Sequence, residues 1–186
     1  MMKTEQQFFN EGQLIQDYME GMSQLKEQSF AVYNQFEVPA EDTFIKQLKN
    51  ANVHMIAITE DWCGDAMVNN PIIRKIGEAA NVEVRAVMRD ADTELIDRYL
   101  TNGGRAIPIY LVLNEAGEVV AKWGPRAPEL QKFVMDMRAN LPEKEDPTFE
   151  EAQKAMYENM RVQYTENKEM WQNVYEDFKK QVTVAL

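Results

Sequence analysis

The most informative stretch of the chain reads Val53-His54-Met55-Ile56-Ala57-Ile58-Thr59-Glu60-Asp61-Trp62-Cys63-Gly64-Asp65-Ala66. Its first half is almost entirely apolar, which is typical of a strand buried on both faces of a parallel sheet. Its second half leads into a predicted helix from Gly64 to about Ala79, so that Cys63 stands at the helix N-terminus. A thiol there faces unpaired backbone N–H groups and the positive end of the helix dipole, and both favour the reactive thiolate.

The charge around Cys63 acts in the opposite direction. Three acids, Glu60, Asp61 and Asp65, flank the cysteine. Nearby negative charge disfavours the thiolate. The sequence leaves the net effect on the pKa of the thiol open.

Strands and helices alternate in the chain that follows. The expected elements are a strand at 53–58, a helix at 64–79, a strand at 82–87, a short helix at 93–100 capped by Asp92, a strand at 109–113, a turn at 114–117, a strand at 119–123 and a helix at 128–140. The first two strands are joined by a long crossover helix and should be parallel, whereas the closing hairpin adds an antiparallel strand. The predicted fold class is α/β, with a mixed four-stranded sheet flanked by helices on both faces.

This part of the chain, about residues 51 to 141, resembles the thioredoxin family. The features that carry the resemblance are Trp62-Cys63-Gly64 at the family's active-site turn, Pro71 eight residues after the cysteine, Ile107-Pro108 before the third strand, Gly117 in the hairpin and Gly124 near the end of the last strand. The resemblance implies a thioredoxin fold with a cis-proline at Pro108 that faces the catalytic turn. It also implies that Cys63 is the nucleophile and that the substrate is bound by Trp62, Gly64, Asp65, Ile107 and Pro108. In this arrangement Ile107 offers backbone groups to a peptide or thiol substrate in extended form.

Two departures from the family pattern change the expected chemistry. Ala66 stands where the family has its second, resolving cysteine, and Ala57 stands where the family has a buried carboxylate that assists it. The two replacements are consistent with each other, because a buried carboxylate that no longer assists a second cysteine would only destabilise the fold. Cys63 could still attack a disulfide, but an external thiol would have to release the mixed disulfide. The resemblance therefore implies chemistry of the monothiol, glutaredoxin-like type.

Helical extensions are expected on both sides of this domain, giving the divisions 1–50, 51–141 and 142–186. Apolar residues recur at three- and four-residue steps in the first segment, with a short helix at about 41–50. The last segment predicts one long helix from 148 to about 181, or two helices that break near 165–167. Its apolar stripe between 149 and 178 is expected to pack on the chain's own core. The alternative is that the terminal helices form a homodimer.

Composition excludes several function classes. The net charge is −11, which argues against binding to nucleic acid or to an anionic membrane surface. The single cysteine permits no internal disulfide, and there is no cluster of cysteines and histidines for a metal. No stretch is apolar enough for a signal peptide or a membrane span. We therefore expect a cytoplasmic protein without a metal or an organic cofactor.

Two functions remain open at this point. The first is a monothiol thiol–disulfide oxidoreductase in cell redox homeostasis, with Cys63 as nucleophile. Its partner would be a disulfide-containing protein or a low-molecular-weight thiol such as glutathione or bacillithiol. The second is a redox-inactive binding or interaction module with a thioredoxin fold, so that enzyme activity is itself undecided. A weaker hypothesis has Arg105 receive a substrate carboxylate.

Overall fold

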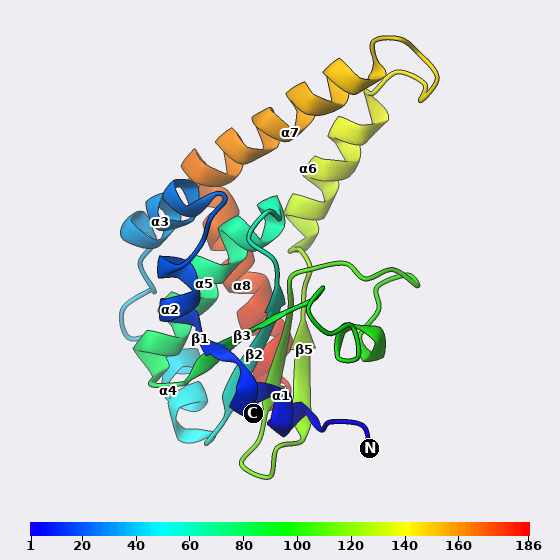
Figure 1. The fold of residues 1–186 in the computed structure, drawn as a ribbon. Helices are drawn as coiled ribbons and strands as arrows, with labels where there is room; N and C mark the ends of the chain where they lie inside the picture. The colour runs from blue at the N-terminus through cyan, green and yellow to red at the C-terminus, as the bar shows by residue number, and fades with distance from the viewer.

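The computed structural model describes residues 1–186 and places a five-stranded sheet at the centre of the molecule (Figure 1). The strands are β1 (Gln13–Leu14), β2 (His54–Thr59), β3 (Val84–Met88), β4 (Ile109–Leu113) and β5 (Val119–Trp123), in the order β1-β3-β2-β4-β5. β2 and β3 are parallel, while β4 and β5 are antiparallel to their neighbours. The predicted α/β fold class with a mixed sheet is confirmed.

The fifth strand, β1, was not among the predicted strands, because the N-terminal segment was expected to be helical. Gln13 pairs with Ala86 of β3 in antiparallel register. Gly12 ends the first helix in an extended conformation, and a Cβ there would lie 3.1 Å from the carbonyl oxygen of Ala86. The close approach of this segment to β3 therefore favours glycine. The apolar residues keep their helical spacing on both sides of Gly12, although the helix itself ends there and a short strand follows. The N-terminal helices are α1 (Glu5–Glu11), α2 (Ile15–Glu20), α3 (Lys26–Gln35) and α4 (Thr43–Asn50).

The helices that follow are α5 (Gly64–Ala80), α6 (Pro128–Ala139), α7 (Phe149–Glu166) and α8 (Lys168–Thr183). The helix predicted at 93–100 is wrong in length, since only the short 3-10 helix η1 (Ile96–Arg98) forms there. The N–H groups of Arg98 and Tyr99 bond three residues back, to the carbonyls of Leu95 and Ile96, which is the pattern of a 3-10 helix. At the C-terminus the second of the two predicted alternatives forms, with two helices that break at Asn167. Asn167 has an extended backbone, and its side chain caps α8 by accepting from the N–H of Glu169.

The two faces of the sheet are covered very unequally. Alternate residues of a strand point to opposite faces, so Met55 and Ala57 of β2 join one core, while Ile56 and Ile58 join the other. The larger core holds 33 buried residues and includes side chains from α2 to α8. The smaller core holds 12 buried residues and is closed by α1 and the segment around η1. Cys63 belongs to the smaller core.

The C-terminal helices are part of the larger core. Trp171 and Tyr175 are almost completely buried, and the indole N–H of Trp171 donates to the carbonyl of Tyr164 at 2.7 Å. α6 and α7 form a hairpin that extends away from the sheet, and α7 then returns toward α3 and α5 (Figure 1). None of the helices combines the length and apolar character that a membrane crossing requires.

Candidate functional site

The turn after β2 places Cys63 at the N-cap of α5. Its Sγ accepts a hydrogen bond from the backbone N–H of Ala66 at 3.5 Å. The thiol donates in turn to the carbonyl of Ile107, also at 3.5 Å. Cys63 is only 8% exposed, so both contacts form in a nearly closed environment.

The segment opposite the thiol is held by a close backbone approach. The Ile107–Pro108 peptide bond is cis, and both residues are buried. Gly124 has a φ of 120°, and a Cβ there would lie 2.4 Å from the carbonyl oxygen of Pro108. Only glycine fits at this position, both for its φ and for the space. Gly124 therefore lets the end of β5 support the proline turn that faces Cys63.

Asp65, two residues after Cys63, lies in a buried network that joins three parts of the chain. Both of its oxygens pair with the Arg126 guanidinium, at 2.9 Å to Nε and 2.7 Å to Nη2. Its Oδ1 also accepts from the hydroxyl of Tyr164 on α7 at 2.8 Å. A bidentate carboxylate–guanidinium pair is both strong and directional. The network therefore ties α7 and the loop before α6 to the first turn of α5.

The surroundings of Cys63 favour the neutral thiol. Burial raises the pKa of Cys63 to about 11, and the negative charge of Asp65 adds to this effect. The N–H groups of Ala66 and Asp65 and the charge of Arg126 lower the pKa, but they do not outweigh the first two causes. The balance that the sequence left open therefore falls on the side of the protonated thiol.

The other two acids that flank Cys63 have structural partners. Asp61 accepts from the backbone N–H and the hydroxyl of Ser23, at 2.9 and 2.8 Å, and from the N–H of Gln24. Burial opposes the charged form of Asp61, but these hydrogen bonds outweigh it and lower its pKa. Glu60 accepts from the N–H of Asp90 at 2.9 Å. Both acids hold the turn in place against neighbouring segments.

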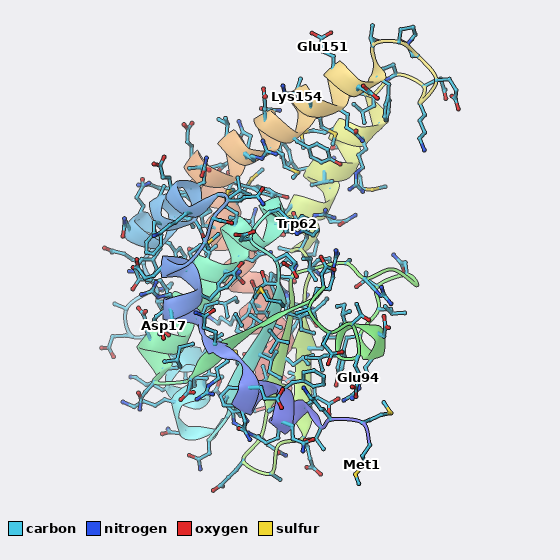
Figure 2. All side chains as sticks on the ribbon, in the orientation of Figure 1. Met1, Asp17, Trp62, Glu94, Glu151 and Lys154 are labelled. Carbon is cyan, nitrogen blue, oxygen red and sulfur yellow. The ribbon has the colours of Figure 1, made fainter.

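A cavity of about 350 Å³ opens beside the thiol. Its lining residues are Trp62, Cys63, Gly64, Asp65, Arg126, Arg138, Tyr157, Met160 and Arg161. Trp62 is 45% exposed and lies where the sheet meets the α6–α7 hairpin (Figure 2). Met160 of α7 packs over Gly64 so closely that a Cβ on the glycine would lie 3.2 Å from its methyl group. We call this cavity the thiol pocket.

The predicted site residues divide into two groups. Trp62, Cys63, Gly64 and Asp65 line the thiol pocket together. Ile107 and Pro108 lie behind the sulfur, outside the lining. The carbonyl of Ile107 faces Cys63 and already accepts the hydrogen bond of the Cys63 thiol.

Sequence reasoning missed the basic residues of the pocket. Arg105, which was considered as a carboxylate receptor, instead pairs with Asp97 at 2.7 Å and does not line the pocket. Arg126, Arg138 and Arg161 line it, the last two from α6 and α7. No local motif marks these three arginines, because the folding of the hairpin over α5 is what brings them to Cys63.

No group of three or more histidine, cysteine or acidic side chains is placed to hold a metal ion. His54 lies 2.7 Å from the Gln6 amide oxygen, with its ring against Phe9. A larger polar cavity of about 650 Å³ shares Arg126 and Arg138 with the thiol pocket but does not reach Cys63.

Comparison with known proteins agrees with this architecture. A solved protein of unknown function from Pseudomonas aeruginosa is similar in fold, with a TM-score of 0.61 and 14% identity over 95% of this chain and 99% of that one. An HIV epitope-scaffold has a TM-score of 0.67 and 13% identity, over 99% of this chain and 100% of that one. At such identities the likeness shows the fold alone. A search of curated proteins found no match. The family model described as thioredoxin matches residues 12–138, which is more than half of the sequence, and the chain therefore belongs to the thioredoxin family.

Proposed function

We propose that this protein carries out thiol–disulfide exchange of the monothiol type, with Cys63 as nucleophile. The observation that carries the proposal is the position of the Cys63 sulfur. It lies at the N-terminus of α5, against the carbonyl of Ile107 and at the edge of the thiol pocket. A disulfide that enters the pocket would meet the sulfur next to N–H groups able to stabilise its thiolate.

The exchange proceeds in two balanced steps. The Cys63 thiol first releases its proton to solvent, and the thiolate attacks one sulfur of a disulfide R–S–S–R′. The Cys63–S–S–R bond forms and R′–S⁻ leaves. A second, external thiolate then attacks the R sulfur, forms a new disulfide and releases the Cys63 thiolate. Since Ala66 replaces a resolving cysteine, the second step requires the external thiol.

The partner in this proposal is a disulfide-bearing protein or a low-molecular-weight thiol and its disulfide, with no further cofactor. Such a cycle depends on a pool of reduced thiols, and we therefore propose the cytoplasm as its location. With a pKa raised by burial to about 11, only a very small fraction of the thiol is ionised at pH 7. The proposed enzyme is therefore slow at rest and becomes faster as the pH rises.

The raised pKa of Cys63 also favours a second candidate function. A thiol that stays protonated and nearly buried suits a redox-inactive thioredoxin-fold module, in which the pocket binds a ligand without reaction. Here Cys63 would pack as a small apolar side chain.

Mixed-disulfide formation separates the two functions. The protein is incubated with oxidised glutathione at several pH values, and its intact mass is followed, with Cys63→Ser as the control. We expect a single adduct on the natural chain only, released by added thiol, whose rate rises about tenfold per pH unit from about pH 7 to pH 10. Failure to form any adduct even at the highest pH would reject the exchange proposal and leave the binding module.

A further inference from the structure

We infer that the thiol pocket binds a small thiol or disulfide that carries carboxylates, and that Arg138 and Arg161 hold those carboxylates. The inference rests on the proposed function for the reaction of the ligand sulfur with Cys63. The recognition of the negative charge rests on the arginines alone.

The pocket is positively charged in a protein that is strongly negative. The chain as a whole has a net charge of −11, yet three arginines and one carboxylate line the pocket. That carboxylate, Asp65, is already satisfied by Arg126 and Tyr164. The charges of Arg138 and Arg161 are therefore left without a counterpart, and a cavity lined by one sign of charge concentrates ligands of the other sign.

Arg138 and Arg161 are exceptional among the arginines of the chain. Neither guanidinium forms an ion pair or donates a hydrogen bond to another side chain. Every other arginine is paired with at least one carboxylate, as in Arg74–Glu78, Arg85–Glu83, Arg89–Asp90, Arg98–Glu94, Arg105–Asp97 and Arg126–Asp65. The two unpaired members both line the one pocket that contains the cysteine.

The helices account for one of the two arginines and not for the other. Arg138 lies in the last turn of α6, where the helix dipole favours a positive charge. Arg161 lies well inside α7, where the dipole has no such effect. Glu158, one turn before Arg161, is within the usual range of a helical ion pair but forms none. A ligand carboxylate supplies the missing partner, since its two oxygens match the paired donors of a guanidinium.

The size and walls of the pocket select the ligand. A volume of about 350 Å³ suits a small molecule and not a folded partner. Trp62, Tyr157 and Met160 provide apolar surface for the carbon chain of the ligand. The ligand sulfur can then face Cys63 while its carboxylates face the arginines on α6 and α7.

The test compares three small disulfides that differ in charge: 3,3′-dithiodipropionate with two carboxylates, neutral 2-hydroxyethyl disulfide, and cystamine with two ammonium groups. The rate of adduct formation on Cys63 is measured by intact mass at low ionic strength. Each rate is divided by the rate of the same disulfide with free 2-mercaptoethanol at the same pH, because the three leaving thiols differ in pKa. On this relative scale we expect the dicarboxylate to react about tenfold or more faster than cystamine. The double variant Arg138→Gln/Arg161→Gln should lose about tenfold more rate with the dicarboxylate than with the neutral disulfide, because the loss of charge beside Cys63 acts on both reactions and only the dicarboxylate also loses its binding partners.

The matched control removes the same charge from a remote surface. Lys46→Gln/Lys49→Gln alters two exposed residues of α4, at the opposite end of the molecule from the α6–α7 hairpin (Figure 1), and should leave all three rates unchanged. Equal relative rates for all three disulfides in the natural chain would overturn the inference while leaving the exchange chemistry intact.

A second readout does not depend on reaction. Binding of 3,3′-dithiodipropionate to Cys63→Ser is measured by calorimetry, with and without the two arginines. Arginine-dependent binding without any exchange in the natural chain would reject the proposed function and retain the carboxylate site. Absence of binding together with absence of exchange would reject both.

Discussion

Two clusters, each made of an aspartate, a basic residue and a tyrosine, join the C-terminal helices to the rest of the chain. In one, Asp65 at the start of α5 pairs with Arg126 and accepts from the hydroxyl of Tyr164. In the other, Asp42 at the N-cap of α4 pairs with Lys179 and accepts from the hydroxyl of Tyr175.

The clusters differ in the basic partner and in the neighbourhood. The Arg126 side chain is 14% exposed and binds both oxygens of Asp65, whereas the Lys179 side chain is 35% exposed and binds one oxygen of Asp42. Only the first cluster lies beside a thiol and a pocket. The cluster around Asp42 therefore joins two helices, whereas the cluster around Asp65 joins helices and also affects the pKa of Cys63 through the charges of Asp65 and Arg126.

Removal of Arg126 should have the largest effect. Arg126→Met leaves the carboxylate of Asp65 buried without its ion-pair partner, which we expect to lower the free energy of unfolding by about 3–5 kcal/mol. It also removes a charge that lowers the pKa of Cys63, so alkylation of the thiol should become slower. Urea denaturation and the pH dependence of iodoacetamide alkylation measure the two effects. A decrease of less than about 1 kcal/mol in the free energy of unfolding would mean that water solvates the Asp65 carboxylate in place of the arginine.

The two tyrosines should come next and should resemble each other. Tyr164→Phe and Tyr175→Phe each delete a hydroxyl that donates to a carboxylate, at 2.8 and 2.6 Å. Each change should lower the free energy of unfolding by about 1.5–3 kcal/mol, because hydrogen bonds to charged groups contribute that much. Thermal or urea denaturation of the pair provides the measurement. Clearly unequal decreases in the free energy of unfolding would show that the two tyrosine hydroxyls do not contribute equally to stability.

The charge of Asp65 should be visible in the reactivity of the thiol. Asp65→Asn removes a negative charge that raises the pKa of Cys63 but keeps an oxygen for Tyr164 and Arg126. We expect alkylation between about pH 7 and 9 to become roughly tenfold faster, which corresponds to about one pKa unit. Asp42→Asn is the control and should leave the alkylation rate as it was. The same acceleration in both variants would indicate general loosening of the fold.

Removal of Lys179 should have the smallest effect. Lys179→Met breaks a partly exposed ion pair, so we expect a loss of about 1 kcal/mol or less at pH 7. Burial alone would raise the pKa of Asp42, but its hydrogen bonds to Tyr175, the Phe44 N–H and Lys179 lower it overall. A carboxyl whose pKa is lowered by folding stabilises the fold fully above its unfolded pKa of about 4, and this contribution is lost as the pH falls through the lower folded pKa. The difference between variant and natural chain should therefore shrink below about pH 4 and vanish once Asp42 is protonated in the folded state. A difference that persists in acid would locate the contribution of Lys179 in packing.

The parts of the fold that sequence could predict are those encoded by local pattern. The apolar run of β2, the turn into α5 and the β4–β5 hairpin each carry their periodicity within a few residues. β1 was missed because its two residues form a strand only through pairing with β3, more than 70 positions away.

The candidate site shows the same limit more sharply. Trp62-Cys63-Gly64 marks the candidate nucleophile in the sequence, but the direction of the pKa shift of Cys63 depends on burial and on the charge of Asp65, which pairs with a distant arginine. Tyr164 follows Asp65 by 99 positions. No spacing rule relates such residues, so the network and the arginines of the pocket required the tertiary structure.

The place of α8 in the larger core has a consequence for how the protein is made on the ribosome. Trp171, Tyr175 and Phe178 are among the largest fully buried side chains. Tyr175 and Phe178 pack against Phe44 of α4, and Phe178 also packs against Trp123 of β5, residues that are synthesised long before them. The nascent chain therefore carries an incomplete core until α8 has emerged, so folding of this core ends after synthesis of its last helix instead of advancing with the growing chain.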